Sequence, residues 1–192
     1  MANITLYLVR HGESEANALG ILSSYPEIPG KSVRHLTEKG IVEVRVTAQM
    51  LAGEAIDVII SSPMTRTVET ATLISEATGI PVAQDIRLRE TDFGKFNMGS
   101  IERFFQAYPE PSKRVETSGD DGLESIEGMR GRVESILHDI AKEYTGKKVV
   151  LVSHADTLEQ IYGFLRDEGV VMSLRGWSPK TASCTKVVWE YK

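Results

Sequence analysis

The 192-residue sequence predicts an α/β fold of three layers, in which helices flank a central, mainly parallel sheet. Short apolar runs with the character of strands alternate along the chain with helix-like stretches. Turn and capping residues separate the two kinds of segment, and no internal repeat or convincing linker interrupts the alternation. We therefore expect residues 1–192 to form a single domain.

The expected strands are short and mostly apolar. The first reads as a buried strand and ends abruptly at the charged, flexible triplet Arg10-His11-Gly12. Three similar apolar runs and one shorter stretch follow it. In chain order, the five expected strands cover residues 4–9, 56–60, 81–84, 149–152 and 185–189.

Two helices are marked by the residues at which they begin. Thr37 is a good N-cap for a stretch that runs from 36 to about 53. A second helical stretch covers about 62–79, with Ser62 as its cap and Pro63 at the first helical position. Each of these stretches ends at a glycine, which is typical of a helix C-terminus.

Two later helices and an irregular segment complete the pattern. A helix from 125 to about 144 should pack on the sheet, because its apolar residues follow the spacing of one helix face: Met129, Val133, Ile136, Leu137 and Ile140. A further helical stretch covers about 157–166. Residues 93–122 break the rhythm with two prolines and a polar, charged run, and we interpret them as a lid or loop excursion.

Composition excludes several classes of function. The net charge of -5 is scattered, which gives no field suited to nucleic acid or to an anionic membrane. No apolar run approaches the roughly 20 residues of a membrane span, and the N-terminus lacks the features of a signal peptide, so we expect a cytoplasmic protein. Cys184 is the only cysteine, and carboxylates lack ligand spacing around the key histidines; we expect neither a metal nor a cofactor.

Candidate catalytic residues follow the ends of three expected strands. Ligands of open α/β sheets bind beyond the carboxyl ends of the strands, where loops converge and helix N-termini present free N–H groups. Two arginines and two histidines should therefore share one rim: Arg10, His11, Arg66 and His154. Guanidinium groups match phosphate oxygens, and a neutral imidazole can attack phosphorus. The pattern predicts a phosphate site.

A phosphoryl transfer also needs a group that protonates the leaving alcohol. A carboxyl group with a pKa adjusted by burial is the natural candidate. Glu90 precedes the excursion and is the first choice; Asp156, two residues after His154, is the second.

Five ordered segments resemble the signatures of one family. They are LVRHGESEAN at 8–17, LTEKG at 36–40, SSPMTRTVETA at 61–71, LRE with FG within 88–94, and VSH at 152–154. Together they resemble the histidine phosphatase superfamily, specifically its phosphoglycerate mutase-like branch, over nearly the whole chain.

This resemblance assigns a role to each candidate. It implies that His11 is the phosphorylated nucleophile and that Arg10, Arg66 and His154 form the phosphate pocket. It also implies that Glu90 is the proton donor. The implied fold is the three-layer α/β architecture of the family, and no metal or cofactor is implied.

Further positions match the family pattern or depart from it. Asn17 matches a residue that contacts the phosphoryl group, and Ser23 lies where a small hydroxyl residue often meets substrate in the mutases. The second histidine is usually followed by glycine, but here Ala155 and Asp156 follow it. Phe96 replaces a more usual tryptophan. These departures put the identity of the substrate in doubt, and the role of Asp156 stays open.

Three functions remain open at this point. The first is a hydrolase that acts on a small phosphorylated metabolite, with water accepting the phosphoryl group from His11. The second is a cofactor-dependent mutase of the phosphoglycerate type, and the third is a non-catalytic binding protein of the same fold. We favour the hydrolase, because the modest excursion at 93–122 and the short C-terminal end should leave the site wetter than in the longer mutases. The particular phosphate ester and a homodimer through a sheet edge also stay open.

Overall fold

The computed structural model describes residues 2–110, 114, 121–170 and 177–191. Within them a five-stranded sheet has the order β3-β2-β4-β1-β5. The strands are β1 (Ala2–Arg10), β2 (Val58–Ser61), β3 (Val82–Gln84), β4 (Lys148–Ser153) and β5 (Cys184–Tyr191). All neighbouring pairs are parallel except β1 with β5, which confirms the predicted, mainly parallel sheet.

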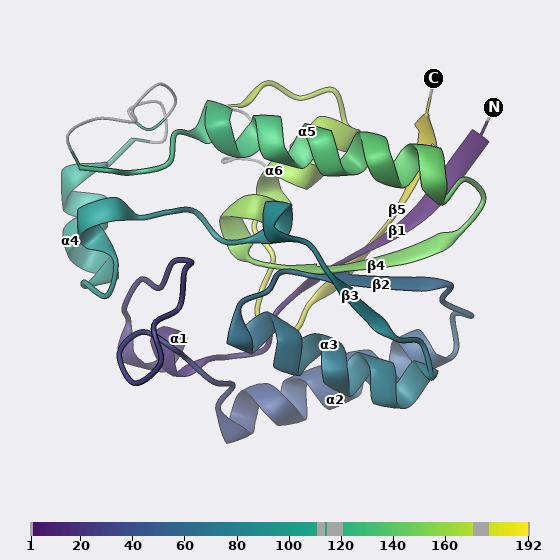
Figure 1. Ribbon diagram of the computed structural model, residues 1–192, viewed down its shortest axis with the longest axis horizontal. Coiled ribbons are helices and arrows are strands. Elements are labelled where there is room, and N and C mark those ends of the chain that lie inside the picture. Colours follow the sequence, from purple (N-terminus) through teal and green to yellow (C-terminus); the bar gives the residue numbers. More distant parts are fainter. Residues whose placement is uncertain (1, 111–113, 115–120, 171–176, 192) are drawn as a thin grey trace.

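Helices cover both faces of this sheet (Figure 1). One face carries α2 (Glu38–Ala52) and α3 (Thr65–Thr78), and the other carries α5 (Ile126–Glu143) and α6 (Ala155–Leu165). Successive side chains of a strand point to opposite faces. Leu6 and Leu8 of β1 accordingly lie in the core beneath α5 and α6, whereas Tyr7 and Val9 lie in the core beneath α2 and α3.

The predicted N-cap at Thr37 is confirmed, and the structure shows a second cap, at Ser125, that was not predicted. The hydroxyl of Thr37 accepts a hydrogen bond from the N–H of Gly40 at the start of α2. Ser125 caps α5 in the same way through the N–H of Gly128. Each bond satisfies a backbone donor that has no partner within its helix.

The predicted start of α3 was wrong. The helix begins at Thr65, its N-cap position is Met64, and Ser62 is not the cap. The Ser62 hydroxyl instead accepts a hydrogen bond from Met64 N and lies 2.8 Å from Nε2 of His154. The residues from Ser62 to Met64 therefore form a turn that holds a buried histidine. Similarly, α6 begins at Ala155, two residues before the predicted start.

The segment interpreted as an excursion contains structure of its own. It includes a 3-10 turn, η2 (Gly94–Phe96), and the short helix α4 (Ile101–Ala107). Aromatic residues of this segment form a small third core, which lies near α1 (Glu15–Leu19). The buried members of this core are Leu22, Phe93, Phe104 and Leu123. Neither α1 nor α4 was predicted. Residues 111–113 and 115–120 of the excursion lie outside the described part of the chain, and its role as a lid stays a prediction.

The parallel strands determine where the candidate residues meet. In the register of the sheet Arg10 lies beside Ser153, and Ser61 lies beside Val152. The carboxyl ends of β1, β2 and β4 therefore coincide at one edge, which brings the residues that follow them together. No helix in the described ranges is long and apolar enough to cross a membrane.

Candidate active site

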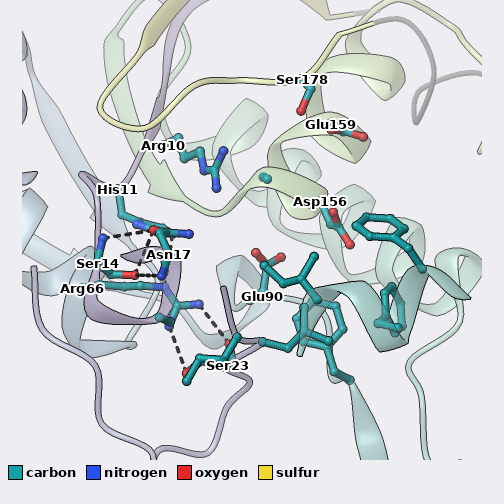
Figure 2. A pocket seen from close by; sticks show the side chains of 18 of the residues that line it. Arg10, His11, Ser14, Asn17, Ser23, Arg66, Glu90, Asp156, Glu159 and Ser178 are labelled. Carbon is teal, nitrogen blue, oxygen red and sulfur yellow. Dashed lines mark hydrogen bonds between the residues drawn. The ribbon is translucent and has the colours of Figure 1, made fainter. Parts of the chain in front are cut away.

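A cavity of about 320 Å³ opens at this edge of the sheet. Figure 2 shows His11, Asn17 and Arg66 on one side of the cavity, and Asp156, Glu159 and Ser178 on the other. Apolar side chains from the excursion and from the segment after α1 complete the wall: Ile21, Leu22, Phe93, Ile101, Phe104 and Phe105. The cavity is therefore polar and charged in one part and apolar in another.

His11 is held in a defined orientation directly after β1. Its backbone N–H donates to the carbonyl oxygen of Ser153, and its ring nitrogen Nδ1 lies 2.7 Å from the carbonyl oxygen of Gly12. A carbonyl oxygen only accepts, so we assign the ring hydrogen to Nδ1. The lone pair is then on Nε2, where it accepts a hydrogen bond from Nε of Arg66 across 3.2 Å.

The surroundings of His11 favour its neutral form. Only 2% of the residue is exposed. Burial, followed by the positive charges of Arg66 and Arg10, holds the pKa of His11 well below its ordinary value. The imidazole is consequently unprotonated at neutral pH and retains the lone pair that a nucleophile needs.

Arg66 lies in the first turn of α3 and is as buried as His11. Its Nη1 donates to Oγ of Ser23 at 3.3 Å, and its Nη2 donates to the Ser23 carbonyl oxygen at 3.0 Å. Arg10 lines the cavity from the end of β1, with Nη1 bonded to the carbonyl oxygen of Pro179 and Nε buried without a partner in the described structure. Two guanidinium groups therefore face one cavity, an arrangement suited to a phosphate.

His154 lies beside His11 and does not line the cavity. The two ring centroids are 5.2 Å apart in an edge-on arrangement. Nε2 of His154 lies 2.8 Å from Oγ of Ser62, while its Nδ1 is buried and has no partner among the described residues. Burial, followed by the positive charge of Arg66, holds the pKa of His154 well below its ordinary value.

Glu90 reaches the cavity from a segment that hydrogen bonds hold against β4 and α6. The hydroxyl of Ser153 donates to the carbonyl of Leu88, and the hydroxyl of Thr157 donates to the carbonyl of Arg89. Burial first, and then the negative charge of Asp156, raises the pKa of Glu90 to about 7 against the opposing effect of nearby arginines. Glu90 can therefore hold a proton near neutral pH and release it to a leaving group.

Asn17 and Ser23 also line the cavity, at the positions that the sequence singled out. Oδ1 of Asn17 accepts hydrogen bonds from the N–H and the hydroxyl of Ser14 at the start of α1. These bonds fix the amide so that its NH₂ group remains available as a donor. Ser23 contacts Arg66 through both its hydroxyl and its carbonyl oxygen, which places the guanidinium.

Comparison with known proteins agrees with this geometry. A sequence model of the histidine phosphatase superfamily (branch 1) matches residues 6–192. The chain belongs to this superfamily. It is 34% identical over 166 residues to phosphoserine phosphatase 1 of Hydrogenobacter thermophilus, covering 83% of this chain and 74% of that protein. It is 32% identical over 159 residues to a probable phosphoglycerate mutase GpmB of Enterobacter sp., covering 81% of this chain and 71% of that protein.

Solved structures of the superfamily share the fold. A mycobacterial glucosyl-3-phosphoglycerate phosphatase in complex with VO3 superposes with a TM-score of 0.81 at 23% identity, covering 95% of this chain and 90% of that one. At that identity the likeness is one of fold. Phosphoserine phosphatase of Entamoeba histolytica, in complex with 3-phosphoglyceric acid, gives a TM-score of 0.77 at 26% identity, with 95% and 89% covered.

The far wall of the cavity in this histidine phosphatase was largely missed by sequence reasoning. Arg114, Glu159 and Ser178 line it together with Asp156. Arg114 comes from the irregular excursion, where no periodicity indicates which residue turns inward. Glu159 lies on α6 one turn after Ala155, so helical spacing alone could have suggested that both share a face. Phe96, the departure from tryptophan, packs in the aromatic cluster and does not line the cavity.

The described ranges contain no group of three or more histidine, cysteine, aspartate or glutamate side chains arranged to hold a metal ion. The positive charges that face the cavity in these ranges are supplied by arginines.

Proposed function

We propose that this protein is a phosphomonoester hydrolase that acts on a small phosphorylated metabolite through a phosphohistidine at Nε2 of His11. The observation that carries the proposal is the buried His11, whose Nε2 accepts a hydrogen bond from Arg66 in a cavity that Arg10 and Glu90 also line. The fold class and the superfamily agree with it, since relatives in the superfamily are named phosphatases and mutases.

In the first step the phosphate dianion lies between Arg10 and Arg66. Nε2 of His11 attacks phosphorus, a P–N bond forms and the ester P–O bond breaks. Glu90 gives its proton to the leaving oxygen, so that an alcohol departs rather than an alkoxide. The NH₂ group of Asn17 donates to a phosphoryl oxygen, and Ser23 keeps Arg66 in place.

In the second step water replaces the alcohol. The Glu90 carboxylate takes a proton from water, whose oxygen forms a bond to phosphorus while the P–N bond breaks. Inorganic phosphate leaves, His11 is neutral again and Glu90 is protonated. We also propose that His154 donates a hydrogen bond to the phosphoryl group on His11. When the hydroxyl of Ser62 donates to Nε2 of His154, the ring hydrogen is on Nδ1, which is buried and has no partner among the described residues. An oxygen of the phosphoryl group would supply that partner.

The cavity favours a small substrate. Its volume of about 320 Å³ holds a phosphate together with a leaving group of a few carbon atoms. Because two relatives are a phosphoserine phosphatase and a probable phosphoglycerate mutase, we propose phosphorylated hydroxy acids and amino acids as the first esters to assay. We further propose that the chain acts as one catalytic domain in the cytoplasm.

Phosphate release from a panel of esters tests this function. The panel contains phosphoserine, both phosphoglycerates, sugar phosphates and nucleoside monophosphates, and the proteins are wild type, His11→Ala and His35→Ala. His35 is an exposed histidine paired with Glu69, outside the cavity, and serves as the matched control. We expect release by wild type and His35→Ala but not by His11→Ala, together with acid-labile phosphate on His11 after rapid quenching.

Two other outcomes would overturn the proposal. Interconversion of 2- and 3-phosphoglycerate far faster than phosphate release would identify a mutase. Equal phosphate release by wild type and His11→Ala would remove His11 from the reaction.

A further inference from the structure

Two carboxyl groups from different elements lie on the same wall of the cavity. Glu90 follows the 3-10 turn η1 (Ile86–Leu88), and Asp156 lies in the first turn of α6. Figure 2 shows both side chains reaching the cavity from that wall. The two segments are joined directly, because Oδ2 of Asp156 accepts a hydrogen bond of 2.9 Å from the hydroxyl of Thr91, the neighbour of Glu90 in the chain.

Asp156 is held in this place from its other side by Arg114. Nη2 of Arg114 lies 2.7 Å from the same carboxylate oxygen, and the side chains of Arg114 and Asp156 are 7% and 22% exposed. The guanidinium of Arg114 lies over the ring of Phe104, with its central carbon 5.0 Å from the centroid. An ion pair with this little exposure keeps the carboxylate from turning into solvent.

The charges that face Glu90 come from every element around it. Arg66 of α3 and Arg10 of β1 are positive, Asp156 of α6 is negative, and His11 is neutral. Burial, and then the charge of Asp156, raises the pKa of Glu159 on α6 to about 8, so that this carboxyl group is mostly protonated at neutral pH. Arg114 lies beyond Asp156. The arginines alone would favour the ionised form of Glu90, which has no proton to give. Burial and the charge of Asp156 oppose them and raise the pKa of Glu90 to about 7.

We propose that Asp156 is a positioning residue for the proton donor: its anchored negative charge keeps Glu90 protonated beside two arginines, and its bond to Thr91 holds Glu90 at the cavity wall. This inference rests on the proposed role of Glu90. After Glu90 has given its proton to the leaving oxygen, the same charge makes the Glu90 carboxylate a stronger base toward water.

The test compares two esters across pH. One is the best alkyl ester of the panel, whose leaving oxygen needs a proton, and the other is p-nitrophenyl phosphate, whose leaving group departs without one. The proteins are wild type, Asp156→Asn, Glu90→Gln and Asp92→Asn. The amide oxygen that Asp156→Asn introduces can still accept the bond from Thr91, so this change removes mainly the charge.

For Asp156→Asn we expect the alkaline limb of kcat/KM for the alkyl ester to move down by about one pH unit, a shift typical of the loss of a nearby like charge. At pH values above the limb, kcat/KM of Asp156→Asn for the alkyl ester should be about tenfold lower than that of wild type, as a pKa shift of about one unit requires. The rate with p-nitrophenyl phosphate should change less than about twofold, because its leaving group needs no proton. Glu90→Gln should nearly abolish alkyl ester hydrolysis at every pH.

Asp92→Asn is the matched control. It makes the same change of charge two residues from Glu90, but its side chain accepts from the N–H of Gly94 and does not line the cavity. We expect no movement of the limb. An unchanged limb in Asp156→Asn would overturn the inference. So would loss of alkyl ester hydrolysis in Asp156→Asn with retention in Glu90→Gln, which would make Asp156 the proton donor.

Two further measurements keep the inference testable. Should Asp156→Asn fail to fold, Thr91→Val removes the hydrogen bond to Asp156 and should move the limb in the same direction by less. Should no ester be hydrolysed, the proposed function fails. The carbon-13 resonance of the Glu90 carboxyl group, titrated in wild type and Asp156→Asn, then shows whether Asp156 raises its pKa, and equal midpoints would overturn the inference.

Discussion

Nε of Arg66 donates a hydrogen bond to Nε2 of His11 across 3.2 Å. The guanidinium thus occupies the position from which the imidazole would attack phosphorus. The bond keeps the lone pair on Nε2 before substrate binds, and it has to be exchanged for a bond to a phosphate oxygen when substrate enters. Arg66 therefore both selects the tautomer of His11 and binds the phosphoryl group in the mechanism that we propose.

Replacement of Arg66 by lysine should separate the effect of the oriented hydrogen bonds of the guanidinium from the effect of its positive charge. An ammonium group keeps the positive charge but lacks the rigid fork that contacts His11 and Ser23 together. We expect kcat/KM to fall about 10²- to 10³-fold, as when an oriented donor is lost from a transition state. Arg45→Lys, an exposed change on α2, should stay within about twofold of wild type. A comparably small effect at Arg66 would contradict the assignment.

The protonation of His11 should differ clearly from that of an exposed histidine in the same protein. The pKa of His11 lies well below 6.5, because of burial and two arginines, whereas the hydrogen bond to Glu69 raises the pKa of His35. At pH 6.5 His11 should therefore be neutral and His35 mostly protonated. Nitrogen-15 chemical shifts of both rings, followed from pH 8 to pH 5, measure this directly. Titration of His11 at or above the midpoint of His35 would refute it.

Gly40 should be required for the position of the loop that follows His11. A Cβ at residue 40 would lie 2.0 Å from the carbonyl oxygen of Glu13, a backbone atom that cannot give way without moving the loop. We expect Gly40→Ala to lower the free energy of unfolding by about 1–3 kcal/mol and to reduce activity with it. Urea denaturation and phosphate release measure the two effects.

The matched control for that change is Gly131→Ala, in α5. A Cβ there would meet open space, so the change should stabilise the helix by about 0.5–1 kcal/mol. Equal effects of the two substitutions would show that the close approach of Gly40 to Glu13 carries no strain.

Activity should persist in the presence of a chelator. In the proposed mechanism Arg10 and Arg66 neutralise the phosphate, and no step requires a metal ion. Phosphate release in excess EDTA should match that in untreated buffer within about twofold, with an assay free of added divalent ions. Loss of activity that a divalent ion restores would show that the charge of the phosphate is neutralised in another way.

Sequence reasoning was most successful where local patterns carry the information. Apolar runs predicted the strands, and the residues after β1 and β4 were expected to meet because parallel strands end at a common edge. It failed at Ser62, whose capping preference is local but whose hydroxyl lies against His154, 92 residues away. It also missed α4, whose aromatic residues pack with Leu22 and Leu123 rather than on the sheet.

The sequence by itself determined the superfamily, the layers of the fold and the candidate residues Arg10, His11, Arg66, Glu90 and His154, because each lies in a motif of consecutive residues. The tertiary structure alone decided the far wall of the cavity and the charge environment of Glu90. The bonds of Asp156 to Thr91 and Arg114 join residues that are 65 and 42 positions apart. Periodicity and capping act over a few residues, whereas burial and the pKa shifts it causes depend on which distant segments pack together.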